Sequence, residues 1–456
     1  MNRTNGGPVP GLRQVTGGGA ADGTARGAGG VNLLALRSHN SALVLDLLRT
    51  AGPDGISRLE LAERTGLTPQ AVSKITARLR EDGLAVEAGR RASTGGKPRT
   101  VLRLVPEAGH AVGVHLDRDG LRAVLADLDG TVVAERHTPL DLGAGAEAVL
   151  TRVAEVVGAL GVPGVPGAAG RTGAADGAVR GLLGVGVALP GPLDHARGVL
   201  HRVTGFPEWD GFPLRDALTE RLGAPVVVDK DTNAAALGLA VGGEGGGEGG
   251  SFAYLHLGTG LGAGLVIGGS VHRGPRTGAG EFGHQVVQLD GPRCPCGDRG
   301  CIEALCLDAV ARGDTQEAAR VLGTGAANLV GLLDIDRVLL GGRTVATAPD
   351  VFVRGVRAVL DARARRTGDP PVTVRIASGG GGRGAAWTPA AGGAVAPAGG
   401  AEGIGGTGGT EGTGGTEGTG DAEGTGGAEG TGGATDGIAE GAAQLVLAPV
   451  FGRDDG

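Results

Sequence analysis

The spacing of apolar residues up to about residue 106 predicts three short helices followed by a hairpin. Apolar residues recur at every third or fourth position within residues 32–50, and again behind Ser57 and behind Thr68. Ser57 and the Thr68-Pro69 pair supply the N-cap hydroxyls and the first-turn proline that helix starts prefer. The predicted buried faces are Leu33, Leu36, Ala42, Leu43, Leu47 and Leu48, then Leu59, Leu61 and Ala62, then Val72, Ile75 and Leu79. With a basic turn at 87–98 and a strand at 99–105, residues 31–106 are predicted to form a winged helix-turn-helix domain.

From residue 109 onward the pattern changes to strands that alternate with helices. Strands are predicted at residues 111–116, 121–127, 183–189, 226–228 and 252–257, and a helix at residues 234–240. Such an alternation predicts an α/β domain. We assign residues 107–378 to this domain, together with residues 438–454, where the apolar stretch 441–451 predicts a last helix that packs back on it.

Glycine interrupts the pattern and limits how much of the chain is packed. Of 456 residues, 96 are Gly and only nine are Phe, Trp or Tyr, so the whole length cannot form one core. Residues 1–30 are predicted to be a disordered tail, 163–180 a loop, and 379–437 a low-complexity linker or insertion. There is no apolar run of membrane-spanning length and no secretory leader pattern, so we expect a cytoplasmic protein without membrane contact.

Charge is divided unevenly between these segments. The net charge is −7, yet residues 31–106 hold 12 Lys and Arg against 7 Asp and Glu. A basic segment joined to an acidic one is expected when the first contacts phosphates, although chance can also produce it. The helix that starts at Thr68 is therefore predicted to enter the major groove of double-stranded DNA, the alternative being a protein-interaction module.

The candidate DNA contacts lie on this helix and on the wing. Gln70, Ser73 and Lys74 are placed to reach base edges. The remaining candidates are Thr68, Arg78 and Arg80 on the helix, and Arg90, Arg91, Lys97 and Arg99 on the wing. The arginines of the helix and all four basic residues of the wing would contact phosphates, which adds affinity and salt dependence with little sequence specificity.

One imidazole and three thiols lie close together in the sequence and predict a metal site. The four residues are His284, Cys294, Cys296 and Cys301. Four such ligands suit tetrahedral zinc and leave no open position, so we predict a structural Zn²⁺. The alternative is a set of ordinary reduced cysteines. Cys306 is outside the spacing and is predicted to be a small buried residue.

Carboxylates near this segment predict a polar ligand site. Asp231 lies between a strand and a helix, and Glu281 and Glu303 flank the metal segment. Together they can accept hydrogen bonds from a polyhydroxylated ligand, with Asp231 as the base if phosphoryl transfer occurs, although singly each is more often a solvated charge. A glycine loop adds four candidates, Gly258, Thr259, Gly260 and Gly262. Its spacing fits a phosphate-binding loop and a tight β-hairpin equally well.

Motifs in this region resemble the ROK family of sugar kinases and sugar-responsive repressors. The resemblance covers about residues 32–378 and the final helix, and its most specific part is Gly-Glu-Phe-Gly-His at 280–284 with the Cys-rich run at 294–303. Residues 231–238 resemble the segment with the kinases' catalytic Asp, and 189–192 another family landmark. The resemblance implies an actin-like, hexokinase-like (ribonuclease H-like) α/β domain with two lobes and a sugar in the cleft. The implied sugar-binding residues are Asp231, Glu281, His284 and Glu303, with His284 also binding zinc.

The chain departs from the kinases of that family in the first phosphate loop. Those kinases carry Asp-x-Gly-Gly-Thr where residues 117–121 read Asp-Arg-Asp-Gly-Leu. An Arg and a second carboxylate would crowd or repel nucleotide phosphates, so we expect no enzyme activity. We expect a DNA-binding regulator, a repressor of carbohydrate-metabolism genes that binds operator DNA as a homodimer or homotetramer under control of a sugar or sugar phosphate. The alternative is an ATP-dependent sugar kinase with an appended DNA-binding module.

Two further departures concern the sugar site. Lys230 stands where the family usually has Asn beside the catalytic Asp, and Gly205 replaces another sugar-contacting Asn. A regulator that has lost its response to ligand is therefore a third hypothesis.

Overall fold

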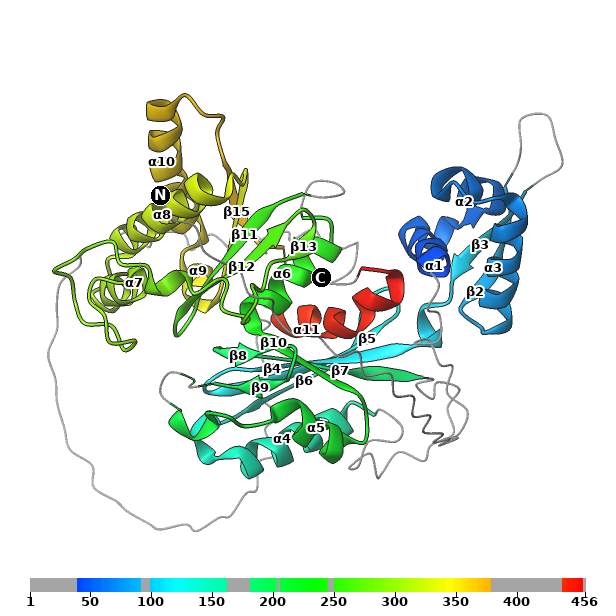
Figure 1. The fold of residues 1–456 in the computed structure, drawn as a ribbon, viewed down its shortest axis with the longest axis horizontal. Helices are drawn as coiled ribbons and strands as arrows, with labels where there is room; N and C mark the ends of the chain where they lie inside the picture. The colour runs from blue at the N-terminus through cyan, green and yellow to red at the C-terminus, as the bar shows by residue number, and fades with distance from the viewer. Residues whose placement is uncertain are drawn as a thin grey trace, which may run out of the picture.

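The computed structural model describes residues 39–91, 99–161, 181–201, 203, 206–244, 250–378 and 437–453, and every structural statement below concerns these residues. The predicted tail at 1–30, the loop at 163–180 and all of the predicted linker at 379–437 except Gly437 lie outside them. In this part of the chain, no helix combines the length and the hydrophobicity needed to cross a membrane. A small helical unit lies beside a larger body built on two sheets (Figure 1).

The small unit is a winged helix-turn-helix, as predicted. Its helices are α1 (His39–Ala51), α2 (Arg58–Thr65) and α3 (Pro69–Glu81). Its sheet has the order β1-β3-β2 and consists of β1 (Ile56–Ser57), β2 (Ala85–Arg91) and β3 (Arg99–Leu104). The turn predicted from residue 87 begins later, because β2 pairs with β3 as far as Arg91 opposite Arg99.

Side-chain caps fix where α2 and α3 begin. Ser57 Oγ accepts a hydrogen bond from the Glu60 N–H at 3.3 Å, and Glu60 Oε2 accepts one from the Ser57 N–H at 2.8 Å, which completes a capping box. Thr68 Oγ1 accepts from the Ala71 N–H at 3.3 Å, with Pro69 in the first turn. Both predicted helix starts are confirmed.

The buried faces of these helices differ in part from the prediction. Leu59 is 42% exposed, because it lies two positions, or about 200°, around α2 from the buried Leu61. On α1, Val44 and Leu45 are fully buried while the predicted Leu43 and Leu47 are half-buried, because α1 also packs against the C-terminal end of the chain. Ile75 is half-buried too. Ala42, Leu48, Ala62, Val72 and Leu79 are buried as predicted. Leu33 and Leu36 lie outside the described residues.

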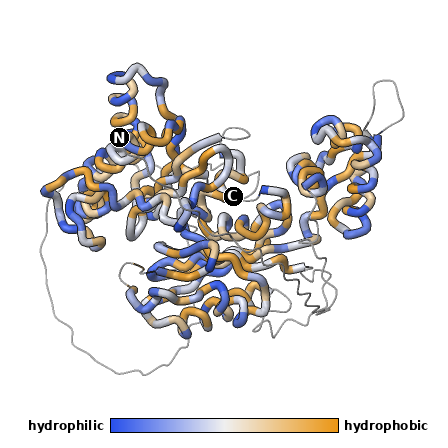
Figure 2. The backbone as a smooth tube through the Cα atoms, viewed as in Figure 1, coloured by the Kyte–Doolittle hydropathy of each residue, from blue (hydrophilic) through white to orange (hydrophobic). Residues whose placement is uncertain are grey.

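The first lobe of the larger body is a five-stranded mixed sheet of order β10-β7-β4-β5-β6. Its strands are β4 (His110–Leu116), β5 (Gly120–Asp127), β6 (Val132–Pro139), β7 (Leu182–Leu189) and β10 (Val226–Lys230). The first three pair antiparallel, whereas β4, β7 and β10 run parallel. Helices α4 (Ala146–Ala159) and α5 (Leu214–Leu222) cover one face, and β8 (Leu193–Asp194) pairs with β9 (Val199–Leu200) in a short hairpin. Hydrophobic residues are concentrated along the strands of this lobe (Figure 2).

The second lobe is another five-stranded sheet, of order β13-β12-β11-β14-β15. Its strands are β11 (Phe252–Leu257), β12 (Leu261–Ile267), β13 (Ser270–Val271), β14 (Arg337–Gly341) and β15 (Thr373–Ile376). Its helices are α7 (Ile302–Ala311), α8 (Thr315–Leu333), α9 (Arg343–Thr347) and α10 (Pro349–Thr367). The sequence pattern predicted β11 but did not single out α8, α10, β14 or β15, nor β6 in the first lobe. The predicted two-lobed α/β fold is confirmed.

The last helix lies between the two sheets. It is α11 (Ile438–Leu447), followed by a 3₁₀ turn, η7 (Ala448–Phe451), and it packs on β4, β7 and α6 (Asp231–Val241) (Figure 1). Strand glycines allow this close contact: a Cβ on Gly113 would lie 1.9 Å from the Ala439 carbonyl oxygen, and one on Gly186 would lie 1.8 Å from that of Ala442. The predicted final helix is therefore confirmed.

A buried ion pair holds α11 in register. The Arg122 guanidinium of β5 makes two hydrogen bonds of 2.6 Å to the Glu440 carboxylate, and both side chains are largely buried. Arg122 also donates to Glu135 at 2.7 Å. These two parallel hydrogen bonds join residues more than three hundred positions apart and fix the rotation of α11 about its axis.

Replacing Gly186 with Ala is expected to destabilise the protein by about 3 kcal/mol, because the new methyl group would displace the α11 backbone. Thermal unfolding of the full chain measures this. Gly278→Ala is the matched control, since a Cβ there meets nothing within 4 Å. Equal melting temperatures for the two variants would contradict the close contact.

Candidate functional site

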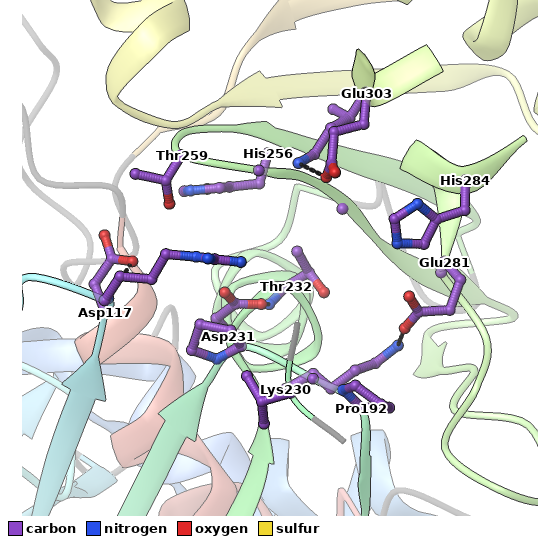
Figure 3. Close-up of a pocket in the computed structure, with 18 of the residues that line it drawn as sticks. Asp117, Pro192, Lys230, Asp231, Thr232, His256, Thr259, Glu281, His284 and Glu303 are labelled. Carbon is purple, nitrogen blue, oxygen red and sulfur yellow. Dashed lines mark hydrogen bonds and ion pairs between the residues drawn. The ribbon is translucent and has the colours of Figure 1, made fainter. Parts of the chain in front are cut away.

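A cavity of about 550 Å³ opens between the two lobes. Its wall combines the β4–β5 turn, the end of β10, the start of α6 and the β11–β12 hairpin with the segment that carries Glu281 and His284 (Figure 3). All four predicted sugar-binding residues, Asp231, Glu281, His284 and Glu303, line it. The structure thus brings together side chains that lie more than seventy positions apart in the sequence.

Asp231 is the first residue of α6, and its Oδ1 accepts a hydrogen bond from the Thr232 N–H at 2.6 Å. Loss of hydration raises the pKa of its carboxyl to about 6, although the nearby His256 opposes the rise. The cavity therefore contains a carboxyl group that changes protonation in the physiological range.

The two glutamates have different local roles. Glu303 Oε2 accepts a hydrogen bond from the Leu261 N–H at 2.8 Å and so anchors the β11–β12 hairpin. Glu281 is 45% exposed and its Oε1 lies 3.2 Å from the ammonium of Lys230 (Figure 3). Lys230 comes from the first lobe and Glu281 from the second, so this ion pair crosses the cavity.

The glycine loop at 258–262 is a tight hairpin in the structure. The Gly258 N–H donates to the Gly260 carbonyl at 2.9 Å, and β11 and β12 pair antiparallel on either side. Gly262 lies within β12, where a Cβ would approach Thr232 Cγ2 to 3.0 Å. Close packing accounts for these glycines, while the hairpin, including Thr259, also lines the cavity. A phosphate-binding role for them stays a prediction.

A second pair of contacts joins the two lobes at the β4–β5 turn, beside the cavity. Arg343, at the start of α9, lies 3.1 Å from Asp119 and 3.6 Å from Asp117. Arg118, between these two carboxylates in sequence, lines the cavity with its guanidinium over the Phe206 ring at 5.6 Å. Nothing in the sequence around Arg343 indicated this contact, because its partners lie more than two hundred positions away.

The predicted metal ligands form one cluster. One ligand atom each from His284, Cys294, Cys296 and Cys301 lies within 4.8 Å of the others. The Cys296 and Cys301 sulfurs are 3.7 Å apart, and Cys294 Sγ is 3.7 Å from His284 Nδ1. Sulfurs on a tetrahedral zinc with bonds of about 2.3 Å lie about 3.8 Å apart, so the cluster has the size to hold a metal ion. Cys306 lies buried on α7, outside the cluster, as predicted.

Of the ten predicted DNA contacts, eight have described side chains and all eight are exposed: Thr68, Gln70, Ser73, Lys74, Arg78, Arg80, Arg90 and Arg99. Arg78 and Arg80 make long ion pairs with Asp82 (3.7 Å) and Glu87 (3.4 Å). Ser73 donates to the Pro69 carbonyl at 2.8 Å. The side chain of Arg91, all of Lys97, and Gly205 of the predicted sugar site lie outside the described residues.

Fold and site together define the class: a two-lobed α/β protein with an interlobe cavity, joined to a winged helix-turn-helix. Sequence profiles agree, since that of the ROK family matches residues 172–310 and that of a winged helix-turn-helix DNA-binding domain matches residues 53–85. The chain therefore carries a ROK family domain behind a winged helix-turn-helix DNA-binding domain.

Several curated proteins are similar to this chain. A putative xylose repressor of Caldicellulosiruptor sp. (strain Rt8B.4) is 27% identical over 350 residues, which cover 68% of this chain and 84% of that protein. The DNA-binding transcriptional dual regulator NagC of Escherichia coli (strain K12) is 32% identical over 284 residues, 61% of this chain and 64% of its own.

A solved structure shares the fold. The crystal structure of a ROK family transcriptional regulator, a homologue of the E. coli MLC protein, matches with a TM-score of 0.60 at 22% identity, over 74% of this chain and 92% of that one. At this identity the match supports the fold alone.

Replacing Asp231 with Asn is expected to stabilise the protein at pH 8 by about 2 kcal/mol and to have little effect near pH 4. The pKa of Asp231 is higher in the folded protein than in the unfolded chain, because its carboxylate is poorly hydrated. The free energy of unfolding of the wild-type protein therefore falls as the pH rises from about 4 through 6. Melting temperatures across this range test it. Asp210→Asn, at an exposed position, is the control, and a difference that stays constant with pH would contradict the shift.

Proposed function

We propose that this protein is a DNA-binding transcriptional repressor whose cavity binds a sugar or sugar phosphate that modulates binding to operator DNA. The names of the similar proteins, xylose repressor and NagC, support the assignment. The observation that carries it is a hydrophobic core shared by the DNA-binding unit and the sugar-kinase-like body, which gives the cavity a physical route to the recognition helix.

We assign DNA reading to α3. Gln70 and Lys74 are exposed on its surface, and within the described residues neither side chain has a hydrogen-bond or ion-pair partner. They are free to contact base edges, while the exposed ion pairs of Arg78 and Arg80 are weak enough to exchange for phosphates. Thr68, Ser73, Arg90, Arg91, Lys97 and Arg99 complete the proposed interface.

The route from cavity to DNA runs through two helices. Helix α6 begins at Asp231 in the cavity and packs on α11, where a Cβ on Gly441 would lie 1.9 Å from the Ala234 carbonyl. The η7 turn that follows α11 contacts α1: Arg453 lies 3.2 Å from Asp46, and the Arg49 guanidinium lies over the Phe451 ring. A ligand that shifts the start of α6 thereby shifts the winged helix, which changes its placement on an operator half-site.

We infer that the cavity does not act as a kinase site. The Arg343 contacts with Asp117 and Asp119 lie at the turn where kinases of the family have their first phosphate loop, and the carboxylates repel nucleotide phosphates. In the kinase alternative, Asp231 with its raised pKa would act as the general base. That alternative requires the protein to turn over ATP. The oligomer that we propose is a homodimer or homotetramer, since paired half-sites require two winged helices.

We also propose that the His284, Cys294, Cys296 and Cys301 cluster holds a structural zinc ion. The cluster offers four soft or borderline ligands and no open position. Burial raises the pKa of the Cys301 thiol to about 12, so deprotonation for binding depends on the positive charge of the metal. When bound, zinc would tie the loop to α7 and hold His284 and Glu303 at the cavity wall.

The purified chain is expected to contain about one zinc per protein, and Cys296→Ser is expected to lose it and to lower the melting temperature. Cys296 is exposed, so its substitution removes no packing. Metal analysis and thermal unfolding measure both effects. Cys306→Ser makes the same chemical change outside the cluster and should keep the metal; a Cys296→Ser protein with full zinc content would rule out this ligand set.

The function is tested by fluorescence anisotropy on DNA from upstream of the protein's own gene against scrambled DNA, with sugars and sugar phosphates added. Arg78→Ala is expected to weaken binding to both DNAs and to reduce the salt dependence by about one phosphate contact, whereas Gln70→Ala and Lys74→Ala should reduce discrimination against scrambled DNA. Arg152→Ala, on the exposed surface of α4, is the control. Equal binding of specific and scrambled DNA in all conditions would contradict the repressor assignment.

A further inference from the structure

The floor of the cavity contains a buried ammonium group. Lys230 ends β10 and is only 3% exposed, yet it contributes to the cavity wall. Its Nζ donates to the Ala279 carbonyl and lies 3.2 Å from Glu281 Oε1. An ammonium has three N–H donors, so within the described residues one donor is left for a molecule in the cavity.

The partners of Lys230 compensate its burial only in part. A buried charge needs close, well-desolvated partners to offset the hydration that it loses. The Ala279 carbonyl is neutral, and the Glu281 carboxylate is 45% exposed, so water screens its attraction. A ligand with its own negative charge would supply the missing compensation.

A second cation faces the same cavity. Arg118 is half-buried, and its guanidinium contacts the Phe206 ring; in the part of the chain that the structure describes, it makes no ion pair. Arg118 therefore presents donors without a carboxylate partner among the described residues, and Lys230 presents a third N–H beyond those used by Ala279 and Glu281. A cavity for a neutral sugar has no need of two such cations.

Acceptors for sugar hydroxyls lie on a different side of the cavity. The Asp231 carboxylate is directed toward Thr232, whereas the Lys230 ammonium is directed toward Glu281 (Figure 3). Glu303 uses one carboxylate oxygen for the Leu261 N–H, so the other has no hydrogen-bond partner among the described residues. A single ligand with hydroxyls at one end and an anionic group at the other fits both sides.

We propose that the ligand of this cavity is a sugar that bears an anionic group, a carboxylate or a phosphate ester, and that Lys230 is the residue that selects it. The proposal rests on the cavity being the effector site of the proposed repressor. The Lys230 ammonium attracts an anionic oxygen more strongly than a hydroxyl oxygen, because both partners are then charged, so the neutral parent sugar binds more weakly. Lys230 thus converts a general sugar site into one specific for anionic sugars.

Isothermal titration of the full chain without DNA tests this. The probes are glucose, galactose, mannose and xylose, the uronate of each, and the terminal phosphate ester of each. At least one anionic sugar is expected to bind about tenfold or more tightly than its neutral parent, as loss of a charged hydrogen bond implies. Lys230→Met should bring that ratio close to one, and Lys230→Arg should keep much of it. Arg197→Met removes a cation that is 81% exposed and does not line the cavity, and should leave the ratio unchanged.

The outcomes distinguish a carboxylate ligand from a phosphate ester, and they distinguish failure of this proposal from failure of the proposed repressor function. In the Asp231→Asn protein, which lacks the carboxyl that ionises near pH 6, a phosphate ester should bind more tightly between pH 5.5 and 7.5 as its second ionisation near 6 completes, whereas a uronate should not. Neutral sugars that bind as tightly as anionic ones, a Lys230→Met protein that keeps the preference, or no binding by any anionic sugar would overturn the proposal. A neutral sugar that binds and also releases operator DNA would overturn it while leaving the repressor function intact.

Discussion

The whole structure depends on how closely α11 approaches the backbone of β4 and β7 on one side and of α6 on the other. Gly113 and Gly186 give it direct contact with β4 and β7, and Gly441 gives it contact with α6. Any side chain at these positions would push the helix outward, because packed interiors have no room for an added methyl group. The Arg122–Glu440 ion pair then fixes the helix in one rotation. A segment far away in the sequence thus becomes the centre of the molecule.

This central position links parts of the protein that bind different partners. The helix packs on α6, whose first residue is in the cavity, and the turn that follows it shares a hydrophobic core with α1. Two ion-pair contacts join the lobes: Lys230 with Glu281, which both line the cavity, and Arg343 with Asp119 beside it. Of these contacts, the ion pair of Lys230 with Glu281 is the one that faces the cavity. This packing is the physical basis of the proposed coupling between ligand binding and the placement of the DNA-binding unit.

Much of the candidate site was predictable because its signals are local. The cysteine spacing identified the metal cluster, and the Thr68-Pro69 pair identified the start of α3. The partners of Arg343 and Lys230 were not predictable, since they lie on other strands and loops and follow no sequence period. Lys230 was visible in the sequence as a departure from the family, but its ion pair with Glu281 appears only when the lobes are folded together.

By itself the sequence determined the elements of the winged helix, the caps of α2 and α3, the His/Cys cluster and three of the cavity carboxylates (Asp231, Glu281 and Glu303), because short-range periodicity and side-chain chemistry specify them. Only the tertiary structure decided which faces are buried. Val44 is buried because the C-terminal segment, not a neighbour in sequence, covers α1, whereas Leu59 is exposed because it lies on the opposite side of α2 from the buried Leu61. The tertiary structure also decided that the glycines at 258–262 form a hairpin, since strand pairing and contact with Thr232 are long-range effects. Residues close together in the sequence specify the local chemistry, whereas burial and ion pairing depend on which distant residues the fold places beside a side chain.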